Sequence, residues 1–355
     1  MFKREKKIRL KGNEKILIVR TDRIGDLILS TSVAEALNQK FPQAHIDFLV
    51  SPYTAPILKN NPFINQIILD DTRSVKDFFK LRKIIKEKKY DLAIVLHPTL
   101  RLAGLLKAAG IPYRIGTGYR GYSFLFNLKH FQHRKTVEKH ELEYNLDMLR
   151  ILGLEPQKIL PKLYLSATEK NEADILLKKL GINDEDIVVL IHPGSGGNAL
   201  NWPTEKFGEL ADRLIESYSV KVLVTGQAGE KILAEKMKSK MRQSFIDLTG
   251  KTDLRLLSAI IGKSDLVICN STGPMHMAAG LNVPTVALFC PIFTASPKRW
   301  GPYGEGHTVI LPPVPACKNC TPPKCERGNC MELITVDNVF EKAGAVLKSK
   351  TKIEK

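Results

Sequence analysis

The sequence contains no long hydrophobic run and only six cysteines among its 355 residues. No apolar stretch approaches the roughly 20 residues that a membrane-spanning helix needs. The first fifteen residues, MFKREKKIRLKGNEK, are highly charged, and no apolar run typical of a signal peptide follows them. We therefore expect a protein of the cytoplasm that packed cores, rather than a disulfide framework, hold together.

Acidic residues are also scarce relative to basic ones. The chain has 37 Asp and Glu against 54 Lys and Arg, which gives a formal net charge of +17. An excess of this size favours an anionic partner such as a nucleotide, a phosphorylated glycan, a lipid headgroup or nucleic acid. The apolar content of 43% and the length are sufficient for two hydrophobic cores.

Short apolar runs alternate with amphipathic segments in two series, and this alternation predicts an α/β protein. The runs of the two series lie at residues 16–20, 45–50, 66–70 and 91–97, and at residues 188–194, 221–226, 245–250, 265–273 and 285–290. The proline-containing segment 154–170 separates them and favours a connection between domains. We expect Rossmann-like, doubly wound domains at 1–160 and 161–335, and a C-terminal helix at 336–355 that crosses back to the first domain.

Residues 15–37 indicate a buried strand, a short polar turn and a helix, with Asp26 at the carboxyl end of the strand. Ligands bind at this edge of open α/β sheets. The turn has one glycine, Gly25, so it is not a G-x-G-x-x-G dinucleotide motif. Asp26 is therefore either a residue that stabilises a helix N-terminus or a catalytic base.

Two turns in the second series suit a phosphate ligand. Each follows an apolar strand and precedes a helix, so each offers backbone N–H donors, although a simple capped helix would look similar. The residues that we assign to a donor phosphate site are Gly194, Ser195, Gly196, Gly197 and Asn198 in the first turn, and Ser271, Thr272, Gly273, Pro274 and His276 in the second.

A cluster of four cysteines lies near the C-terminus: Cys317, Cys320, Cys325 and Cys330. Their spacing is compact enough for four thiolates to surround one zinc ion. Two disulfides and unligated thiols are the other interpretations. A zinc ion with four protein ligands would be structural, since no coordination position stays open for catalysis.

Two basic segments occur in the first half of the chain. Residues 93–137 contain no acid and include Arg101 and Arg120 among interleaved aromatic residues, which suits an anionic acceptor or a solvated face. Residues 75–89 form an amphipathic helical pattern that could lie on an anionic bilayer or pack on the sheet. Neither segment matches a nucleic-acid motif, so we expect no nucleic-acid partner.

Four segments in register, at residues 15–37, 140–153, 192–207 and 270–289, resemble the ADP-heptose:lipopolysaccharide heptosyltransferases of glycosyltransferase family 9. The resemblance covers nearly the whole chain. It implies a GT-B fold, in which two Rossmann-like domains face a cleft. The N-terminal domain would bind the acceptor, and the C-terminal domain would bind the nucleotide-sugar donor.

The resemblance further implies an inverting transfer of heptose from ADP-L-glycero-D-manno-heptose to a Kdo-lipid A type acceptor. Asp26 of the R-x-G-D turn would be the general base, and no cofactor would be required for catalysis. We assign Arg23, Arg101, Arg120 and His140 to the anionic glycolipid acceptor, although His140 could equally cap a helix. Such an acceptor implies peripheral contact with the cytoplasmic face of the inner membrane.

Two departures from the family pattern bear on the donor. Leu200 stands where a basic residue often neutralises the donor phosphates, so Lys206, Lys298 or backbone donors would have to replace it. Ser271 stands where an acid usually contacts donor hydroxyls. A nucleotide-sugar epimerase or hydrolase, or a non-catalytic protein that binds anionic glycans, are therefore the alternative functions.

Overall fold

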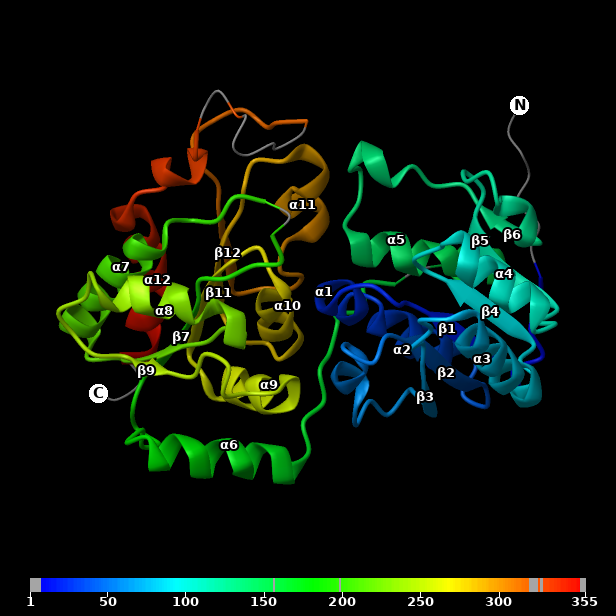
Figure 1. Ribbon diagram of the computed structural model, residues 1–355, viewed down its shortest axis with the longest axis horizontal. Helices are drawn as coiled ribbons and strands as arrows, with labels where there is room; N and C mark the ends of the chain where they lie inside the picture. The colour runs from blue at the N-terminus through cyan, green and yellow to red at the C-terminus, as the bar shows by residue number, and fades with distance from the viewer. Residues whose placement is uncertain (1–7, 156, 198, 319–324, 326–327, 352–355) are drawn as a thin grey trace. The chain divides into compact units, whose positions relative to one another are not determined.

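The computed structural model describes residues 8–155, 157–197, 199–318, 325 and 328–351. The chain divides into two compact units, Met1–Tyr164 and Leu165–Lys355. Within the described residues, each unit is built on a parallel sheet of six strands with helices on its faces (Figure 1). None of the helices in the described parts of the chain is long and apolar enough to cross a membrane.

The first unit contains a sheet in the order β3-β2-β1-β4-β5-β6. Its strands are β1 (Lys15–Val19), β2 (His45–Val50), β3 (Gln66–Leu69), β4 (Leu92–Val95), β5 (Tyr113–Thr117) and β6 (Leu128–His130). Its helices are α1 (Ile24–Ile28), α2 (Thr31–Lys40), α3 (Val75–Lys88), α4 (Leu100–Ala108) and α5 (Glu141–Asp147), with short 3₁₀ turns η1 (Ala55–Leu58), η2 (Ser123–Leu125), η3 (Arg134–Thr136) and η4 (Met148–Leu152).

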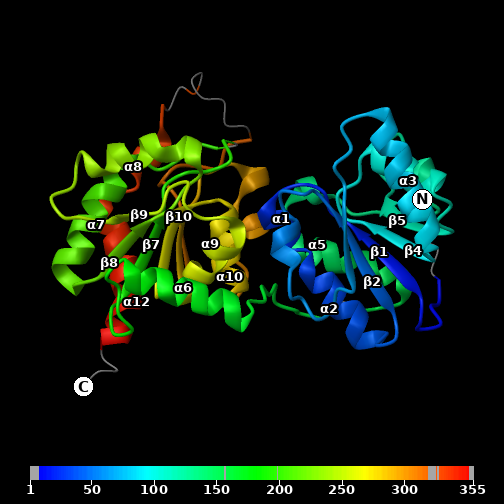
Figure 2. The same ribbon diagram turned by 60° about the horizontal axis from the view of Figure 1, so that its bottom comes forward.

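The central strands of the first sheet are apolar on both faces because helices cover both faces. Leu81 and Ile85 of α3 pack with α4 on one face of the sheet. Helices α2 and α5 lie side by side on the other face (Figure 2). After β1 the chain continues to β2 on one side of β1, whereas after β4 it continues to β5 on the other side. The turn after β1 therefore lies at a topological switch point of the sheet.

The second unit repeats this plan with a sheet in the order β12-β11-β10-β7-β8-β9. Its strands are β7 (Val188–His192), β8 (Lys221–Val224), β9 (Ile246–Asp247), β10 (Leu266–Asn270), β11 (Thr285–Leu288) and β12 (His307–Ile310). Its helices are α6 (Ala167–Lys179), α7 (Thr204–Tyr218), α8 (Lys231–Lys238), α9 (Leu254–Lys263), α10 (Gly273–Gly280), α11 (Pro297–Trp300) and α12 (Val336–Thr351), with 3₁₀ turns η5 (Ala228–Glu230), η6 (Phe293–Ala295) and η7 (Cys330–Leu333).

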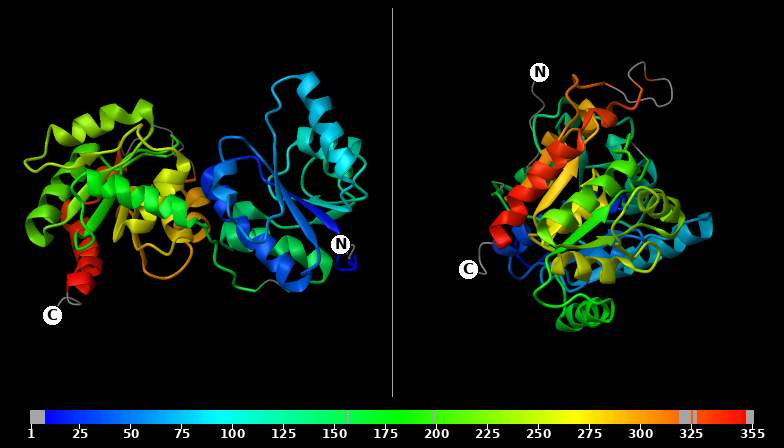
Figure 3. Two further views of the ribbon diagram at one scale, coloured as in Figure 1. Left: turned by 90° about the horizontal axis from the view of Figure 1, so that it is seen from below. Right: turned by 90° about the vertical axis from the view of Figure 1, so that its left-hand side faces the viewer.

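The C-terminal helix α12 packs within the second unit. It lies against α7 and against β10 and β11 of the second sheet, as Figure 3 shows from two sides. Val339, Ala343 and Leu347 of α12 are buried in the same core as Trp202. The described part of this helix thus completes the second core, and its crossing to the first domain stays a prediction.

The apolar runs predicted the central strands well. Every run named in the sequence overlaps a strand of the structure, from β1 to β4 and from β7 to β11. The segment 154–170, expected to be a connection, is irregular only to Ser166, which caps α6. The strands β5, β6 and β12 were not predicted. Strand β6 has only three residues, β12 is half-buried over most of its length, and Tyr113 and Arg114 of β5 are too polar or exposed to form an apolar run.

Candidate active site

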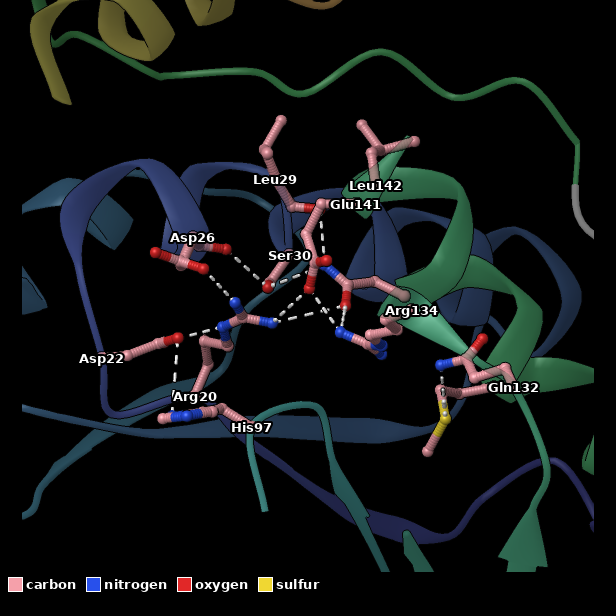
Figure 4. A network of polar contacts seen from close by, with 12 residues as sticks. Arg20, Asp22, Asp26, Leu29, Ser30, His97, Gln132, Arg134, Glu141 and Leu142 are labelled. Atoms are coloured by element: carbon pink, nitrogen blue, oxygen red, sulfur yellow. Dashed lines mark hydrogen bonds and ion pairs between the residues drawn. The ribbon is translucent and has the colours of Figure 1, made fainter. Parts of the chain in front are cut away.

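A buried arginine organises the turn after β1. Arg20 follows the last residue of β1, and its guanidinium contacts three carboxylates (Figure 4). Its Nε donates to Oδ1 of Asp22 at 2.7 Å, its Nη2 pairs with Oδ1 of Asp26, and its Nη1 lies 3.4 Å from Oε1 of Glu141. A buried guanidinium requires such partners, so these contacts fix the position of the turn.

Asp26 points toward this arginine and does not cap a helix. It occupies the first turn of α1, where a negative charge is favourable, but Arg23 is the N-cap residue and no side chain caps this helix. Oδ2 of Asp26 has no hydrogen bond to any residue that the structure describes, and the side chain is 16% exposed. One oxygen is therefore held in place while the other can accept a proton from a ligand.

Helix α5 contributes the other half of the network. Glu141, its first residue, also pairs with Arg134, and Asn145 accepts from Arg134 Nη1 at 3.3 Å. Asn145 Nδ2 donates to the backbone carbonyl of Leu29 at 3.2 Å, just beyond α1. These contacts join two segments that lie more than 100 residues apart in the sequence.

Burial and the neighbouring charges together set the pKa of Asp26. Three carboxylates share two guanidiniums, and water is largely excluded. Burial raises the pKa of Asp26 to about 6, with further increases from Asp22 and Glu141, while Arg20 acts in the opposite direction. An ionised Asp26 near neutral pH is consequently a stronger base than an ordinary aspartate.

His97 extends the network beyond β4. Its Nδ1 lies 3.5 Å from Oδ2 of Asp22. Burial lowers the pKa of His97, and the guanidiniums of Arg20 and Arg134 lower it further, although Asp22 opposes them. The imidazole is therefore neutral at pH 7 and leaves the charge balance around Asp26 unchanged.

The residues assigned to the acceptor have different surroundings. His140 caps α5, because its Nδ1 accepts from the backbone N–H of Leu142 at 3.2 Å, as in the alternative interpretation. Arg101 forms a bidentate pair with Asp70. Arg23 and Arg120 are exposed on the unit that carries Asp26. Their contact with an acceptor stays a prediction.

The acid-free segment 93–137 is only partly a free basic surface. Arg114 donates to the carbonyls of Leu125 and Ile111, so its guanidinium supports the loop after β5. Arg134 pairs with Glu141, as described above. Folding therefore uses several of the basic groups that the composition assigned to an acceptor.

In the second unit, a buried asparagine joins the two predicted phosphate turns. Asn270 ends β10, next to β7 in the sheet, so both turns emerge side by side. Its Nδ2 donates to the carbonyl of Pro193 at 2.7 Å, and its Oδ1 accepts from the backbone N–H of Trp202 at 2.9 Å. The two turns expected in the donor site are thus brought together.

The first turn presents both donors and an acid. Gly196 and Gly197 are exposed, and Ser195 Oγ donates to Asn201 at 2.7 Å. The carboxylate of Glu230 lies against Gly194, where even a single Cβ atom would clash with it. Because a carboxylate accepts from hydroxyl groups and repels phosphate, this side of the turn suits sugar hydroxyls. Asn198, the remaining residue assigned to this turn, lies outside the described residues.

The second turn opens α10 with its backbone donors accessible. Thr272 is the N-cap residue, but its side chain makes no capping hydrogen bond, and Pro274 occupies the first turn. Ser271, Thr272 and Gly273 are partly exposed, whereas His276 is buried further along the helix. A helix N-terminus of this kind favours an anion such as a diphosphate.

The lysines considered as substitutes at Leu200 differ in availability. Leu200 packs against the core of the second unit. Lys206 donates to the carbonyls of Glu332 and Ile334 at 2.5 and 3.0 Å, so its ammonium group is engaged in holding η7. Lys298 is exposed at α11. Backbone donors and Lys298 are the groups that remain for the donor phosphates.

The cysteine cluster is only partly described. Cys317 and Cys325 are half-buried, Cys330 is buried, and these three are not in disulfides. Cys320 lies outside the described residues. Within the described ranges no group of His, Cys, Asp or Glu is arranged to hold a metal ion. The zinc interpretation stays a prediction.

Three residues that the sequence did not single out shape these sites: Arg20, Asn270 and Glu230. Arg20 and Asn270 each lie at the carboxyl end of a strand, the side of a sheet where ligands bind, so their positions could have marked them from the sequence. Glu230 follows β8 by several residues, and no local pattern marks its approach to Gly194. Contacts over such distances depend on the folded topology.

Comparisons with known proteins agree with this architecture. The family model for glycosyltransferase family 9 (heptosyltransferase) matches residues 78–330. Lipopolysaccharide heptosyltransferase 2 of Escherichia coli K12 is 31% identical over 313 residues, which cover 83% of this chain and 87% of that protein.

Two solved structures are similar over nearly the full length. A family 9 glycosyltransferase from Veillonella parvula DSM 2008 has a TM-score of 0.87 at 23% identity, covering 97% of this chain and 99% of that one. The ADP-heptose lipopolysaccharide heptosyltransferase II of Escherichia coli has a TM-score of 0.79 at 26% identity, covering 95% and 99%. The predicted GT-B fold is thereby confirmed.

Proposed function

The chain belongs to glycosyltransferase family 9, and we propose on this premise that it transfers a heptose from ADP-L-glycero-D-manno-heptose to a lipopolysaccharide-core acceptor of the Kdo-lipid A type. The names of the relatives support both substrates, since they are heptosyltransferases of lipopolysaccharide and one is described with ADP-heptose. The observation that carries the proposal is the Asp26 carboxylate, held by Arg20 at the carboxyl edge of the first sheet.

On the acceptor side, Asp26 is the general base. Oδ2 takes the proton from the acceptor hydroxyl as its oxygen attacks the anomeric carbon of the heptose. Arg20 and the α5 residues keep the carboxylate in one orientation. A positioned base of this kind contributes about 10²- to 10⁴-fold to the rate.

On the donor side, the second unit holds the leaving group. The bond between the anomeric carbon and the diphosphate oxygen breaks, and its electron pair leaves with ADP on the face opposite the attack. The N-terminus of α10 stabilises the growing negative charge through its backbone donors. Glu230, beside Gly194, accepts from hydroxyl groups of the donor. The product has the inverted configuration.

The assignment also sets the surroundings in which the enzyme works. A Kdo-lipid A acceptor is anchored in a bilayer, so the enzyme meets its substrate from the cytoplasm at the inner membrane surface. The N-terminal domain, proposed for residues 1–160, binds the acceptor, and the domain at 161–335 binds the donor. No cofactor takes part in the reaction as written.

The test is to incubate the protein with ADP-heptose, with and without a Kdo-lipid A acceptor, and to measure ADP release. The proposal predicts release that depends on the acceptor, together with an acceptor of increased mass. Consumption of the donor without acceptor would indicate an epimerase or a hydrolase instead. Binding of donor with no turnover would indicate a glycan-binding protein. A panel of other nucleotide sugars tests the donor identity, on which the departures at Leu200 and Ser271 bear.

A further inference from the structure

The outer face of α3 exposes apolar side chains that do not pack in the core. The inner face of the helix packs on the first sheet, where Leu81 and Ile85 are buried, as the packing alternative predicted. Val75 and Phe79 lie one turn apart on the outer side, where they are 74% and 56% exposed. Helix α3 forms part of the outer surface of the first unit (Figure 1).

Basic side chains surround these two residues. Lys76, Lys80, Lys83 and Lys86 are all exposed on α3. Its two acids are already engaged: Asp77 completes the capping box with Ser74, and Glu87 lies 3.9 Å from Lys83. Of these lysines, Lys76, Lys80 and Lys86 form no ion pair with any residue in the described ranges. The outer face therefore combines apolar side chains with a surplus of positive charge.

Further exposed apolar residues lie at the carboxyl edge of the first sheet, from which the chain enters α3. Leu69 ends β3, and Leu100 begins α4, and both are at least half exposed. The Arg101–Asp70 ion pair brings the start of α4 to the end of β3 and neutralises the acid there. This is the carboxyl edge of the first sheet, to which Asp26 also belongs.

We propose that the outer face of α3, composed of Val75, Lys76, Phe79, Lys80 and Lys83, docks on the surface of an anionic lipid bilayer. Apolar side chains enter the boundary between headgroups and acyl chains, and lysines bind anionic headgroups. Charge complementarity selects this occupant, since a second copy of this basic face would be repelled. The inference deepens the proposed function, on which it rests for a membrane-anchored acceptor.

The test is cosedimentation of the full-length protein with vesicles. One set contains phosphatidylethanolamine and phosphatidylglycerol, and the other contains phosphatidylcholine alone. We expect binding to the anionic vesicles only, weakened by salt. The double variant Val75→Ser, Phe79→Ser should bind about tenfold more weakly. The variant Lys76→Gln, Lys80→Gln should bind more weakly and with a smaller dependence on salt.

A matched control comes from the second unit. Ile175 and Ile232 are 60% and 54% exposed on helices α6 and α8, and their double substitution by Ser should leave vesicle binding unchanged. Thermal unfolding of each variant verifies its fold, and analytical ultracentrifugation detects self-association. Equal binding by the α3 variant and the wild type, equal binding to both vesicle sets, or a dimer lost on substitution would overturn the inference.

Turnover of a water-soluble, delipidated acceptor separates this inference from the proposed function. The α3 variant should process that acceptor at the wild-type rate, because Asp26 and Arg20 are untouched. Vesicle binding without any heptose transfer would contradict the proposed function and leave the docking face standing. Transfer to the soluble acceptor without vesicle binding would contradict the docking face alone.

Discussion

The Asp26 carboxylate shares one buried guanidinium with two other acids. When all its groups are ionised, this cluster has more negative than positive charge, because its three carboxylates pair with two guanidiniums, those of Arg20 and Arg134. Burial raises the pKa of Asp26, and the charges of Asp22 and Glu141 raise it further, so this carboxylate is a stronger base than an exposed aspartate. Arg20 limits this rise and fixes the orientation of the side chain.

Substitution of Asp26→Asn should remove the base without changing the shape of the turn. We expect kcat to fall about 10²- to 10⁴-fold, with ADP binding unchanged when measured by calorimetry. Asp71→Asn is the control, since Asp71 is exposed and pairs with Arg73 at the surface. A wild-type rate in Asp26→Asn would show that another group accepts the proton.

The pH dependence of the reaction should report the same carboxylate. Because the base must be ionised, kcat/KM should rise with pH and level off above about pH 6, the pKa of Asp26. Asp22→Asn removes a negative charge that raises this pKa, so the rising limb should move to lower pH. A limb that does not move, with Asp71→Asn run in parallel, would argue that a different group controls it.

At the scale of elements, neighbouring strands of the second sheet bring together turns that lie far apart in the sequence. Asn270 connects them through Pro193 and Trp202, and Glu230 places its carboxylate against Gly194. The turn is therefore close-packed on one side and open on the other. A Cβ atom at position 194 would have to displace the Glu230 carboxylate, whereas the φ of Gly194 lies outside the left-handed region and sets no such limit.

Gly194→Ala should weaken donor binding. The new methyl group has to displace the Glu230 carboxylate, and with it the acceptor for the donor's hydroxyl groups. We expect the Kd for ADP to increase about tenfold or more, measured by calorimetry. Gly104→Ala, in α4 with nothing within 4 Å of the added atom, is the control and should leave the Kd unchanged. Equal affinities in both variants would remove Glu230 from the donor site.

Helices α6 and α9 are joined by a buried ion pair. Arg255 donates to Glu169 through Nε at 2.8 Å and Nη2 at 2.7 Å. Arg255→Met should lower the free energy of unfolding by about 3–5 kcal/mol, because it leaves a buried carboxylate without its guanidinium. Urea denaturation followed by circular dichroism measures the change.

The same two helices supply the control for this substitution. Lys263 of α9 pairs with Asp174 of α6 at 2.7 Å, but the two side chains are 39% and 33% exposed. Lys263→Met should cost less than about 1 kcal/mol. Similar losses in both variants would mean that burial does not set the strength of these pairs.

Element by element, the sequence predicted what depends on local pattern. Continuous apolar runs marked the buried central strands, Asn270 ends one such strand, and Asp26 lies in the helix that follows another. The role of His140 as a cap was one of two alternatives, since the local sequence does not distinguish a helix N-cap from a residue that contacts a ligand. The engagement of Lys206 with the carbonyls before α12 depends on residues more than 100 positions away. No local pattern encodes it.

For the whole molecule, the net charge of +17 includes basic groups with different roles in the fold. Arg20, Arg114, Arg134 and Arg255 hold loops and helices together, as their contacts show. Lys76, Lys80, Lys83 and Lys86 of α3 are exposed at the surface. Composition therefore predicted an anionic partner. Only the folded structure shows which basic groups form contacts within the protein and which are left to bind a ligand.

The central claim is that one base in the first unit and one leaving group in the second produce an inverting transfer. The most direct test is the configuration at the anomeric carbon of the transferred heptose, measured by the one-bond carbon–hydrogen coupling in the NMR spectrum of the product. The account predicts the configuration opposite to that of the ADP-heptose donor. A product that retains the donor's configuration would contradict it, because a single in-line attack with Asp26 as the general base inverts the anomeric carbon.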